Sequence, residues 1–355
     1  MDSKLNEVIV GIEPPSLEWR QQAREYLRKL AIPQGSLGEL LNLAEQLAAI
    51  KQSLKPSVRN KTVVTMAGDH GVVAEGVSAF PQEVTPQMVA NFVAGGAAIN
   101  VLAEVAGAGV VVVDMGVAAD LGGLVKEGKI LSYKVDYGTR NMAVGPAMTR
   151  RQAVQALEAG IEIAGKLVSE GAELLATGDM GIGNTTPSSA ILAAFSGLPV
   201  HEVTGKGTGI SDEALQNKVR VIQKALDINK PDANDPVDVL AKVGGFEIGG
   251  IAGLILGAAY HKIPVVVDGF ISSAGALLAK ALAPNAVNYM IAAHQSMEYG
   301  HQFMLKELGL KPLLNLNLRL GEGTGAALAM NIVEASAQVL AKMLTFEDAG
   351  VTSNV

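Results

Sequence analysis

The sequence predicts an α/β protein with a Rossmann-like parallel sheet flanked by helices. Short runs rich in β-branched residues are typical of strands that are buried on both faces, and they recur at residues 61–67, 109–115, 172–177 and 263–268. Segments with apolar residues at helical spacing lie between these runs, including residues 151–169 and 212–226. Alternating strands and helices indicate parallel strands with helices packed on both faces of the sheet.

Glycine or an acidic residue beside glycine follows each predicted strand. Gly68-Asp69, Gly116, Gly178-Asp179 and Asp268-Gly269 occupy these positions, and a further strand at 287–292 precedes His294. In parallel α/β sheets the ligand crevice lies at the carboxyl ends of the strands. These polar, glycine-rich ends are therefore expected to meet at one site.

Both ends of the chain are helical in pattern. Residues 16–53 carry leucines at three- and four-residue spacings, and Pro33 and Gly35 divide them into two helices. A last helix is predicted at 326–343. We expect these helices to form a small domain from residues 1–58 and 331–355, beside a large α/β domain at 59–330.

Composition excludes several classes of protein. The 355 residues carry a net charge of −7 with no basic block, which argues against a nucleic-acid partner. The chain has no cysteine, so disulfides and thiolate chemistry are excluded. No signal-peptide pattern is present, and the longest apolar stretch, near 248–260, is short and glycine-rich. We expect a cytoplasmic protein that does not bind membranes.

The segment around Glu322 carries the most chemical information. Alternating side chains at 314–318 predict a strand, and Gly321-Glu322-Gly323 then precedes an apolar, alanine-rich helix. Glycines allow a sharp turn and close approach of a ligand, so the carboxylate would stand where α/β folds bind ligands. The alternative is a glutamate that only stabilises a helix N-terminus.

Two glycine-rich loops resemble anion sites. Residues 178–187 combine glycines with two threonines at a helix start, and residues 205–212 form a second loop with Lys218 on the helix that follows. Neither contains the Gly-Lys-Ser/Thr of a nucleotide-triphosphate loop. Ordinary capped turns and a solvated lysine are the alternatives.

Other candidates are weaker when taken alone. Asp69 and Asp268 at strand ends suit recognition of ribose hydroxyls but are also common turn residues. Phe80, Met88 and Met180 would form an apolar slot for an aromatic ring, or simply belong to the core. None of the five histidines has HExxH spacing, so no metal site is expected.

Six motifs together resemble the nicotinate-nucleotide–dimethylbenzimidazole phosphoribosyltransferase family, which activates the lower ligand of cobamides. Their order and spacing agree from about residue 33 to residue 343. They lie at residues 67–72, 141–148, 183–187, 242–246, 268–270 and 319–323. The resemblance implies a Rossmann-like fold, a reaction without a cofactor, and a homodimer or a heterodimer with a paralogous chain.

The resemblance also implies roles for residues. Glu322 would be the general base that takes the proton of an incoming aromatic base, and Asp179 falls at the family's second catalytic carboxylate. Inversion at the anomeric carbon requires attack from the face opposite the leaving nicotinate. Residues in the segments near the nucleotide and its phosphate are Gly181, Thr185, Thr186, Gly205, Gly207, Lys218, Asp268, Gly269 and Ser296.

The chain departs from the family at its base pocket. Phe80 and Met88 stand where benzimidazole-activating members carry polar Ser and Gln, Met180 replaces a leucine, and Leu320 completes the set. Asp179 is shorter than the glutamate of many members. We expect a smaller, more apolar pocket that accepts phenol or p-cresol, alone or beside dimethylbenzimidazole. A non-catalytic nucleotide-binding subunit is the alternative, although such a chain would be expected to lose Glu322.

Overall fold

A single sheet of six parallel strands organises the chain in the computed structural model, which describes residues 3–207 and 209–352. The spatial order of the strands is β3-β2-β1-β4-β5-β6, the order of the dinucleotide-binding Rossmann sheet. The predicted α/β class is confirmed. The strands are β1 (Lys61–Gly68), β2 (Ala108–Gly116), β3 (Leu131–Ser132), β4 (Leu174–Met180), β5 (Val265–Val267) and β6 (Met290–Ala292).

The order of the strands reverses between β1 and β4, which pair in parallel from Lys61 opposite Leu174 to Ala67 opposite Met180. In open α/β sheets such a switch point opens the crevice where ligands bind. The β4 strand runs to Met180, beyond the end at Thr177 that the sequence predicts, so Asp179 is the penultimate residue of a paired strand rather than part of a free loop.

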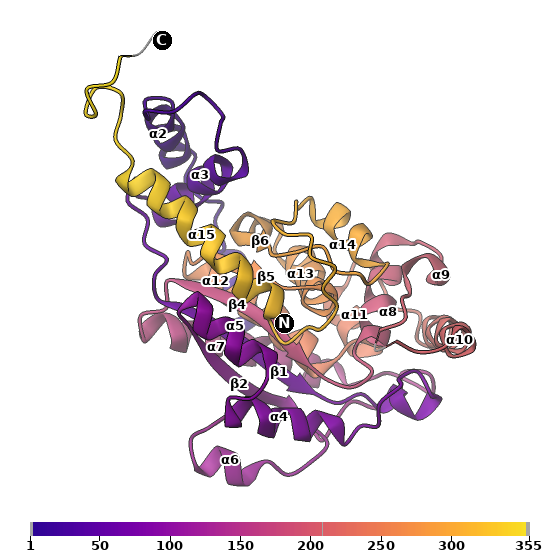
Figure 1. Ribbon diagram of the computed structural model, residues 1–355. Coiled ribbons are helices and arrows are strands. Elements are labelled where there is room, and N and C mark those ends of the chain that lie inside the picture. Colours follow the sequence, from indigo (N-terminus) through magenta and orange to yellow (C-terminus); the bar gives the residue numbers. More distant parts are fainter. Residues whose placement is uncertain (1–2, 208, 353–355) are drawn as a thin grey trace.

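Helices cover both faces of the sheet (Figure 1). Alternate strand residues explain why: Val64 and Met66 of β1 lie in one apolar cluster, whereas Val63 and Ala67 lie in another. The helices are α1 (Ser3–Gly11), α2 (Leu17–Leu27), α3 (Glu39–Lys51), α4 (Val84–Ala94), α5 (Ala98–Ala106), α6 (Gly122–Lys126), α7 (Arg150–Ser169), α8 (Thr185–Ser196), α9 (Val200–Val203), α10 (Asp212–Asn229), α11 (Pro236–Val243), α12 (Phe246–Tyr260), α13 (Phe270–Leu282), α14 (His301–Leu308) and α15 (Thr324–Lys342).

The α12 helix is the apolar stretch that the sequence analysis set aside as too short for a membrane. It is buried almost from end to end and packs against α7 and α13. A Cβ at Gly160 or Gly253 would collide with backbone atoms of the facing helix, so these glycines permit the close approach of α7 and α12.

The two chain ends meet, as Figure 1 shows for α2, α3 and the long helix α15. Ala23, Leu27, Ala48 and Leu340 belong to one apolar cluster between them. The first helix, α1, lies elsewhere, with Leu5 and Val8 in the cluster that α7 and α12 build. Domain boundaries at residues 58 and 330 stay a prediction.

The strand predicted at residues 314–318 is wrong. Leu314 forms an isolated parallel bridge with His294, and Asn317 adopts a left-handed backbone conformation with φ of 56°, which ends extended pairing. The alternation of leucine and asparagine does not separate a buried face from an exposed one: Asn315, Leu316 and Asn317 are all exposed, Leu316 by 52%. This segment still runs beside the chain after β6, because the N–H of Met297 donates to the carbonyl of Leu318 at 3.0 Å.

One segment of the described chain, Val84–Ala106, is long and apolar enough by composition to cross a membrane. The fold divides it into α4 and α5 at Gly95, whose φ is 77°. Phe92 and Ile99 are buried in the cluster on one face of the sheet. The segment is thus two helices of the α/β fold rather than one continuous helix.

Candidate active site

Glu322 lies in a turn that β1 and β4 hold at the carboxyl edge of the sheet. Its N–H donates to the carbonyl of Asp179 on β4 at 3.1 Å, and its carbonyl accepts from Thr65 Oγ1 on β1 at 2.8 Å. Its φ of 63° is left-handed, which is unfavourable for a residue with a side chain. A Cβ at Gly178 would collide with the Glu322 carbonyl, so the turn also requires that glycine.

The carboxyl group of Glu322 is only 4% exposed and points toward the start of α5. Its Oε2 accepts a hydrogen bond from the N–H of Ile99 at 3.2 Å. Burial raises the pKa of Glu322 above its ordinary value, the Ile99 N–H opposes this rise, and the charge of Asp268 adds to it. The effect of burial is therefore larger than that of the Ile99 hydrogen bond.

Asp179 lies beside Glu322 and is equally buried. Its Oδ2 accepts from Asn184 Nδ2 at 2.9 Å, whereas its Oδ1 is buried without a hydrogen bond to any described residue. Burial, with the charges of Asp268 and Glu247, raises the pKa of Asp179 well above its ordinary value. Burial therefore disfavours the ionised form of Asp179.

The two glycine-rich loops come together around Lys218. Its Nζ donates to Thr185 Oγ1 at 2.6 Å and to the carbonyl of Gly205 at 3.3 Å. A Cβ at Gly207 would lie 2.8 Å from Thr185 Oγ1 and 3.3 Å from Lys218 Nζ. The alternative of a solvated surface lysine is wrong: Lys218 is fully buried, and burial lowers its pKa to about 8.

Thr186 and Gly181 complete the loop after β4 in different ways. Thr186 Oγ1 is buried and has no hydrogen-bond partner among the described residues, so it remains available to a ligand. A Cβ at Gly181 would collide with the carbonyl oxygen of Gly68, so this glycine lets the ends of β1 and β4 approach each other. Thr208, in the second loop, lies outside the described residues.

Glu298 is a neighbour of the lysine that sequence reasoning missed. A Cβ at Gly205 would collide with its Oε2, an oxygen that is buried without a hydrogen bond in the part of the chain described. Its charge raises the pKa of Lys218 and so partly offsets the effect of burial. An isolated glutamate in the irregular segment after β6 gives no periodic signal.

Ser296 and Gly269 lie against two buried histidines. The N–H of Ser296 donates to His301 Nδ1 at 2.8 Å, and His301 Nε2 therefore carries the proton and donates to Ser273 Oγ at 2.9 Å. Burial, together with the charge of His294, lowers the pKa of His301 to about 3. A neutral His301 thus fixes the backbone that carries Ser296.

Sequence reasoning also missed the partner of His70. His70 Nε2 lies 2.7 Å from Glu247 Oε1 on α12, and both side chains are buried. The pKa of His70 is raised: burial, the largest single effect, lowers it, but the charge and hydrogen bond of Glu247 and the charge of Asp69 together outweigh burial. A single glutamate in the apolar run at 246–260 was the signal that could have identified this pair.

The residues predicted to bind the aromatic base are only partly brought together. Met88 of α4 and Met180 of β4 are half-buried and pack against the same apolar cluster. Phe80 is 50% exposed and Leu320 is 59% exposed, and neither belongs to that cluster. Their joint role in base binding stays a prediction.

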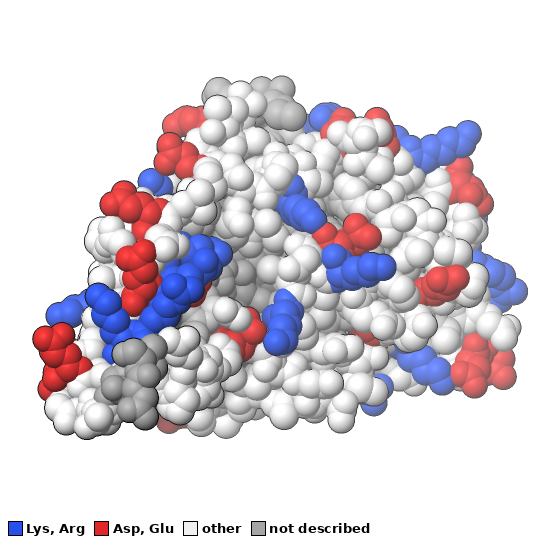
Figure 2. Space-filling model, turned by 90° about the horizontal axis from the view of Figure 1, so that it is seen from above, with Lys and Arg blue, Asp and Glu red and all other residues white. Residues whose placement is uncertain are grey.

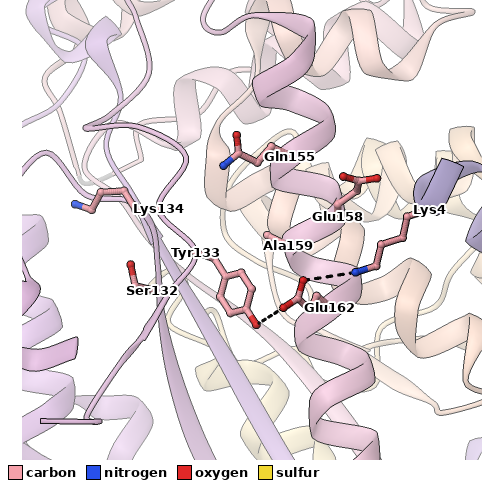
Figure 3. Close-up of a pocket in the computed structure, with 8 residues that line it drawn as sticks. All are labelled: Lys4, Ser132, Tyr133, Lys134, Gln155, Glu158, Ala159 and Glu162. Carbon is pink, nitrogen blue, oxygen red and sulfur yellow. Dashed lines mark hydrogen bonds and ion pairs between the residues drawn. The ribbon is translucent and has the colours of Figure 1, made fainter. Parts of the chain in front are cut away.

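Two surface clefts lie away from these residues. One of them, with a volume of about 310 Å³, lies between α1, α7 and the segment around β3. In this cleft Lys4 and Tyr133 both contact Glu162, whereas Lys134 points away (Figure 3). Its lining includes none of the carboxylates or glycine-rich loops described above, so it is not the candidate site. Figure 2 shows charges of both signs on one face, with Lys and Arg near a central hollow.

Across residues 3–207 and 209–352, no group of three His, Asp or Glu side chains is arranged for a metal ion.

Fold and site together define the class: an α/β enzyme of Rossmann-like topology with buried carboxylates at the switch point of its sheet. A family model described as "Phosphoribosyltransferase" matches residues 12–351. The nicotinate-nucleotide–dimethylbenzimidazole phosphoribosyltransferase of Syntrophotalea carbinolica is 58% identical over 348 residues, covering 98% of each chain. The enzyme of the same name from Geobacter sulfurreducens is 58% identical over 347 residues, with the same coverage.

Solved structures agree with the sequence comparison. The crystal structure of CobT from Thermus thermophilus superposes with a TM-score of 0.90 at 48% identity, covering 95% of this chain and all of that one. The chain belongs to the nicotinate-nucleotide–dimethylbenzimidazole phosphoribosyltransferase family. The family resemblance drawn from its motifs is therefore confirmed.

Proposed function

We propose that this protein transfers phosphoribose from nicotinate mononucleotide to an aromatic base in the assembly of the cobamide nucleotide loop. The observation that carries this proposal is the buried carboxyl group of Glu322, which lies beside Asp179 at the end of β4. The loop that follows β4 leads to Thr185, whose hydroxyl group contacts Lys218. Relatives that share 58% of their residues with this chain carry the name of that activity.

Glu322 acts as the general base in this proposal. The nucleophilic nitrogen or oxygen of the acceptor bonds to the anomeric carbon of the ribose while a proton of the acceptor passes to Glu322: the hydroxyl proton of a phenol, or the proton on the other ring nitrogen of a benzimidazole. The bond from that carbon to the pyridinium nitrogen breaks, and nicotinate leaves with the electron pair. Because the leaving ring becomes neutral, no acid is needed on its side. A base with a pKa raised toward neutrality is suited to this proton transfer.

The donor phosphate is held by Lys218, Thr185, Gly205 and Gly207, with Thr186 as a further donor. Lys218 supplies a buried positive charge, and binding of the phosphate dianion would keep it protonated. Asp179, in its protonated form, offers a hydrogen bond through an oxygen that has no other partner among the described residues. Gly269 and Ser296 approach the nucleotide from the neighbouring strand ends.

Phe80, Met88, Met180 and Leu320 select the base. Apolar side chains at the positions of polar ones favour phenol or p-cresol, beside or instead of 5,6-dimethylbenzimidazole. The products are α-riboside 5′-phosphates. The protein works in the cytoplasm as a homodimer, or as a heterodimer with a paralogous chain. A non-catalytic subunit is disfavoured because Glu322 is present and buried.

Product analysis tests the proposal. The purified protein is incubated with nicotinate mononucleotide and, separately, with dimethylbenzimidazole, benzimidazole, phenol and p-cresol, and the riboside phosphates are identified by mass. We expect products with at least one phenol. Turnover of dimethylbenzimidazole alone would refute the choice of base but not the reaction, whereas no product with any acceptor would refute both. Glu322→Gln serves as the inactive control.

A further inference from the structure

Asp268 engages the first turn of the helix that follows Glu322. Its Oδ1 accepts from the N–H of Ala326 at 2.8 Å, and its Oδ2 accepts from the N–H of Gly323 at 3.3 Å. The N–H of Gly325 contacts the same carboxylate. Its own N–H donates to Thr177 Oγ1 on β4 at 3.1 Å, so its backbone is anchored to the adjacent strand.

These contacts occupy the backbone N–H groups of Gly323, Gly325 and Ala326 at the start of α15. The remaining N–H of this turn, on Thr324, donates to the carbonyl of Gly321 at 3.0 Å. The first N–H groups of a helix normally await a cap or an anion. Here none of those on Gly323 to Ala326 is left for a phosphate, and Asp268 itself is 1% exposed.

Glu322 directly precedes this turn and is held in an unfavourable conformation. A left-handed φ at a residue with a side chain persists only where neighbouring contacts impose it. The contacts come from three adjacent strands: Thr65 on β1, Asp179 on β4, and Asp268 directly after β5. Of these three residues, Asp268 is the one whose carboxylate accepts hydrogen bonds from backbone N–H groups at the start of α15.

We propose that Asp268 is a positioning residue that holds the Glu322 turn through the N-terminus of α15, rather than an acceptor for a ribose hydroxyl. The inference rests on the proposed role of Glu322 and names the group that keeps that carboxyl in place. The negative charge of Asp268 compensates the positive N-terminal end of α15. The carboxyl group of Glu322 instead accepts a hydrogen bond at the start of α5.

Charges around Glu322 set the expected direction of the pH dependence. Asp268 faces it from the end of β5 and disfavours its ionised form, and Asp179 faces it from β4. His294 lies 3.8 Å from Asp268 Oδ1 and Glu247 lies near Asp179. Removing the charge of Asp268 should therefore make Glu322 easier to ionise.

The variant Asp268→Asn tests the proposal, since an amide keeps the size of the side chain but cannot accept from all three N–H groups. We expect kcat to fall about 10- to 100-fold because the base is misplaced. The Kd for nicotinate mononucleotide should stay within about threefold of wild type, and the acid limb of the pH–rate profile should move to lower pH. Asp268→Ser, which retains one acceptor, is measured in parallel.

Asp114→Asn is the matched control. Asp114 lies near the end of β2, is also 1% exposed, and accepts an N–H bond from Val117, and no described hydrogen bond joins it to the Glu322 turn. We expect its pH profile to match wild type. An Asp268 variant that weakens nucleotide binding about tenfold or more without moving the acid limb would overturn the proposal in favour of hydroxyl recognition. An Asp268→Asn enzyme with wild-type kcat would overturn it as well.

A direct titration separates this inference from the assignment of the base. The carboxyl carbon of labelled glutamate is followed by ¹³C NMR, and the Glu322 signal is identified by its loss in Glu322→Gln. Asp268→Asn should lower the midpoint of that signal. If Glu322→Gln retains turnover but the midpoint still moves, the general base is wrong and the positioning role stands. An unmoved midpoint contradicts the positioning role even where Glu322 is the base.

Discussion

Lys218, the buried lysine of the proposed phosphate site, should make the ligand-free enzyme less stable than a neutral residue at that position would. Lys218 is fully buried with its Nζ on Thr185 and Gly205, and its pKa is lowered from 10.5 to about 8. The perturbation is Lys218→Met, which keeps the length and removes the charge.

The sign follows from the two pKa values. Because the folded pKa is depressed, the unfolded chain binds more protons between pH 8 and 10.5, and stability rises with pH in that window. Below pH 8 the full cost of burying the charge remains, about 3 kcal/mol at 1.36 kcal/mol per pKa unit. Between pH 7 and pH 10, wild type should therefore gain about 2.5 kcal/mol relative to Lys218→Met.

Binding should change in the opposite sense. A lost hydrogen bond between charged groups costs about 1.5–3 kcal/mol, so Lys218→Met should weaken nicotinate mononucleotide about 10- to 150-fold. Wild-type affinity should also fall about tenfold per unit above pH 8, as the lysine deprotonates.

Denaturant unfolding of both proteins at pH 7, 8, 9 and 10, with calorimetry for the nucleotide, measures these effects. Lys224→Met on the same helix is the control, since Lys224 is exposed and should leave both quantities unchanged. Unfolding free energies of wild type and Lys218→Met that run in parallel from pH 7 to pH 10 would refute the reasoning.

Two further predictions concern glycine packing and base choice. Gly178→Ala should abolish most activity, because the added methyl group collides with the Glu322 carbonyl; Gly123→Ala, where a Cβ meets nothing within 4 Å, should leave the rate and the melting temperature unchanged, and equal rates for both variants would contradict this packing. Phe80→Ser combined with Met88→Gln should shift the kcat/KM ratio toward dimethylbenzimidazole over p-cresol by about 10-fold or more, measured by competition, and an unchanged ratio would remove these residues from the base pocket.

The fold was predictable where local patterns decide it. Continuous β-branched runs identified β1, β2 and β5, and the apolar run at 172–177 identified β4, because strands buried on both faces need apolar residues at most positions. The prediction was wrong at residues 314–318, where alternating leucines indicated a strand. Most of this segment is exposed, and the left-handed conformation of Asn317 interrupts its extended backbone. Alternation alone does not reveal which side of a chain is covered.

The burial of the candidate residues agrees with their prediction from the sequence, but their contacts were not predictable. The glycine-rich spacing around Glu322 and the loop before Lys218 singled out two side chains that the structure buries, and their chemical roles stay predictions. Spacing could not show that Ile99, 223 positions away along the chain, donates to Glu322, or that Glu247 pairs with His70 across 177 positions. Such long-range contacts depend on the assembled sheet, so a single sequence carries no local trace of them.

The central claim is that Glu322 removes a proton from the incoming base while the donor is held elsewhere. The most direct measurement is single-turnover phosphoribosyl transfer by Glu322→Gln, with nucleotide binding measured on the same preparation. The account predicts unchanged affinity for nicotinate mononucleotide and a rate reduced about 10²- to 10⁴-fold. A rate within about threefold of wild type would contradict it.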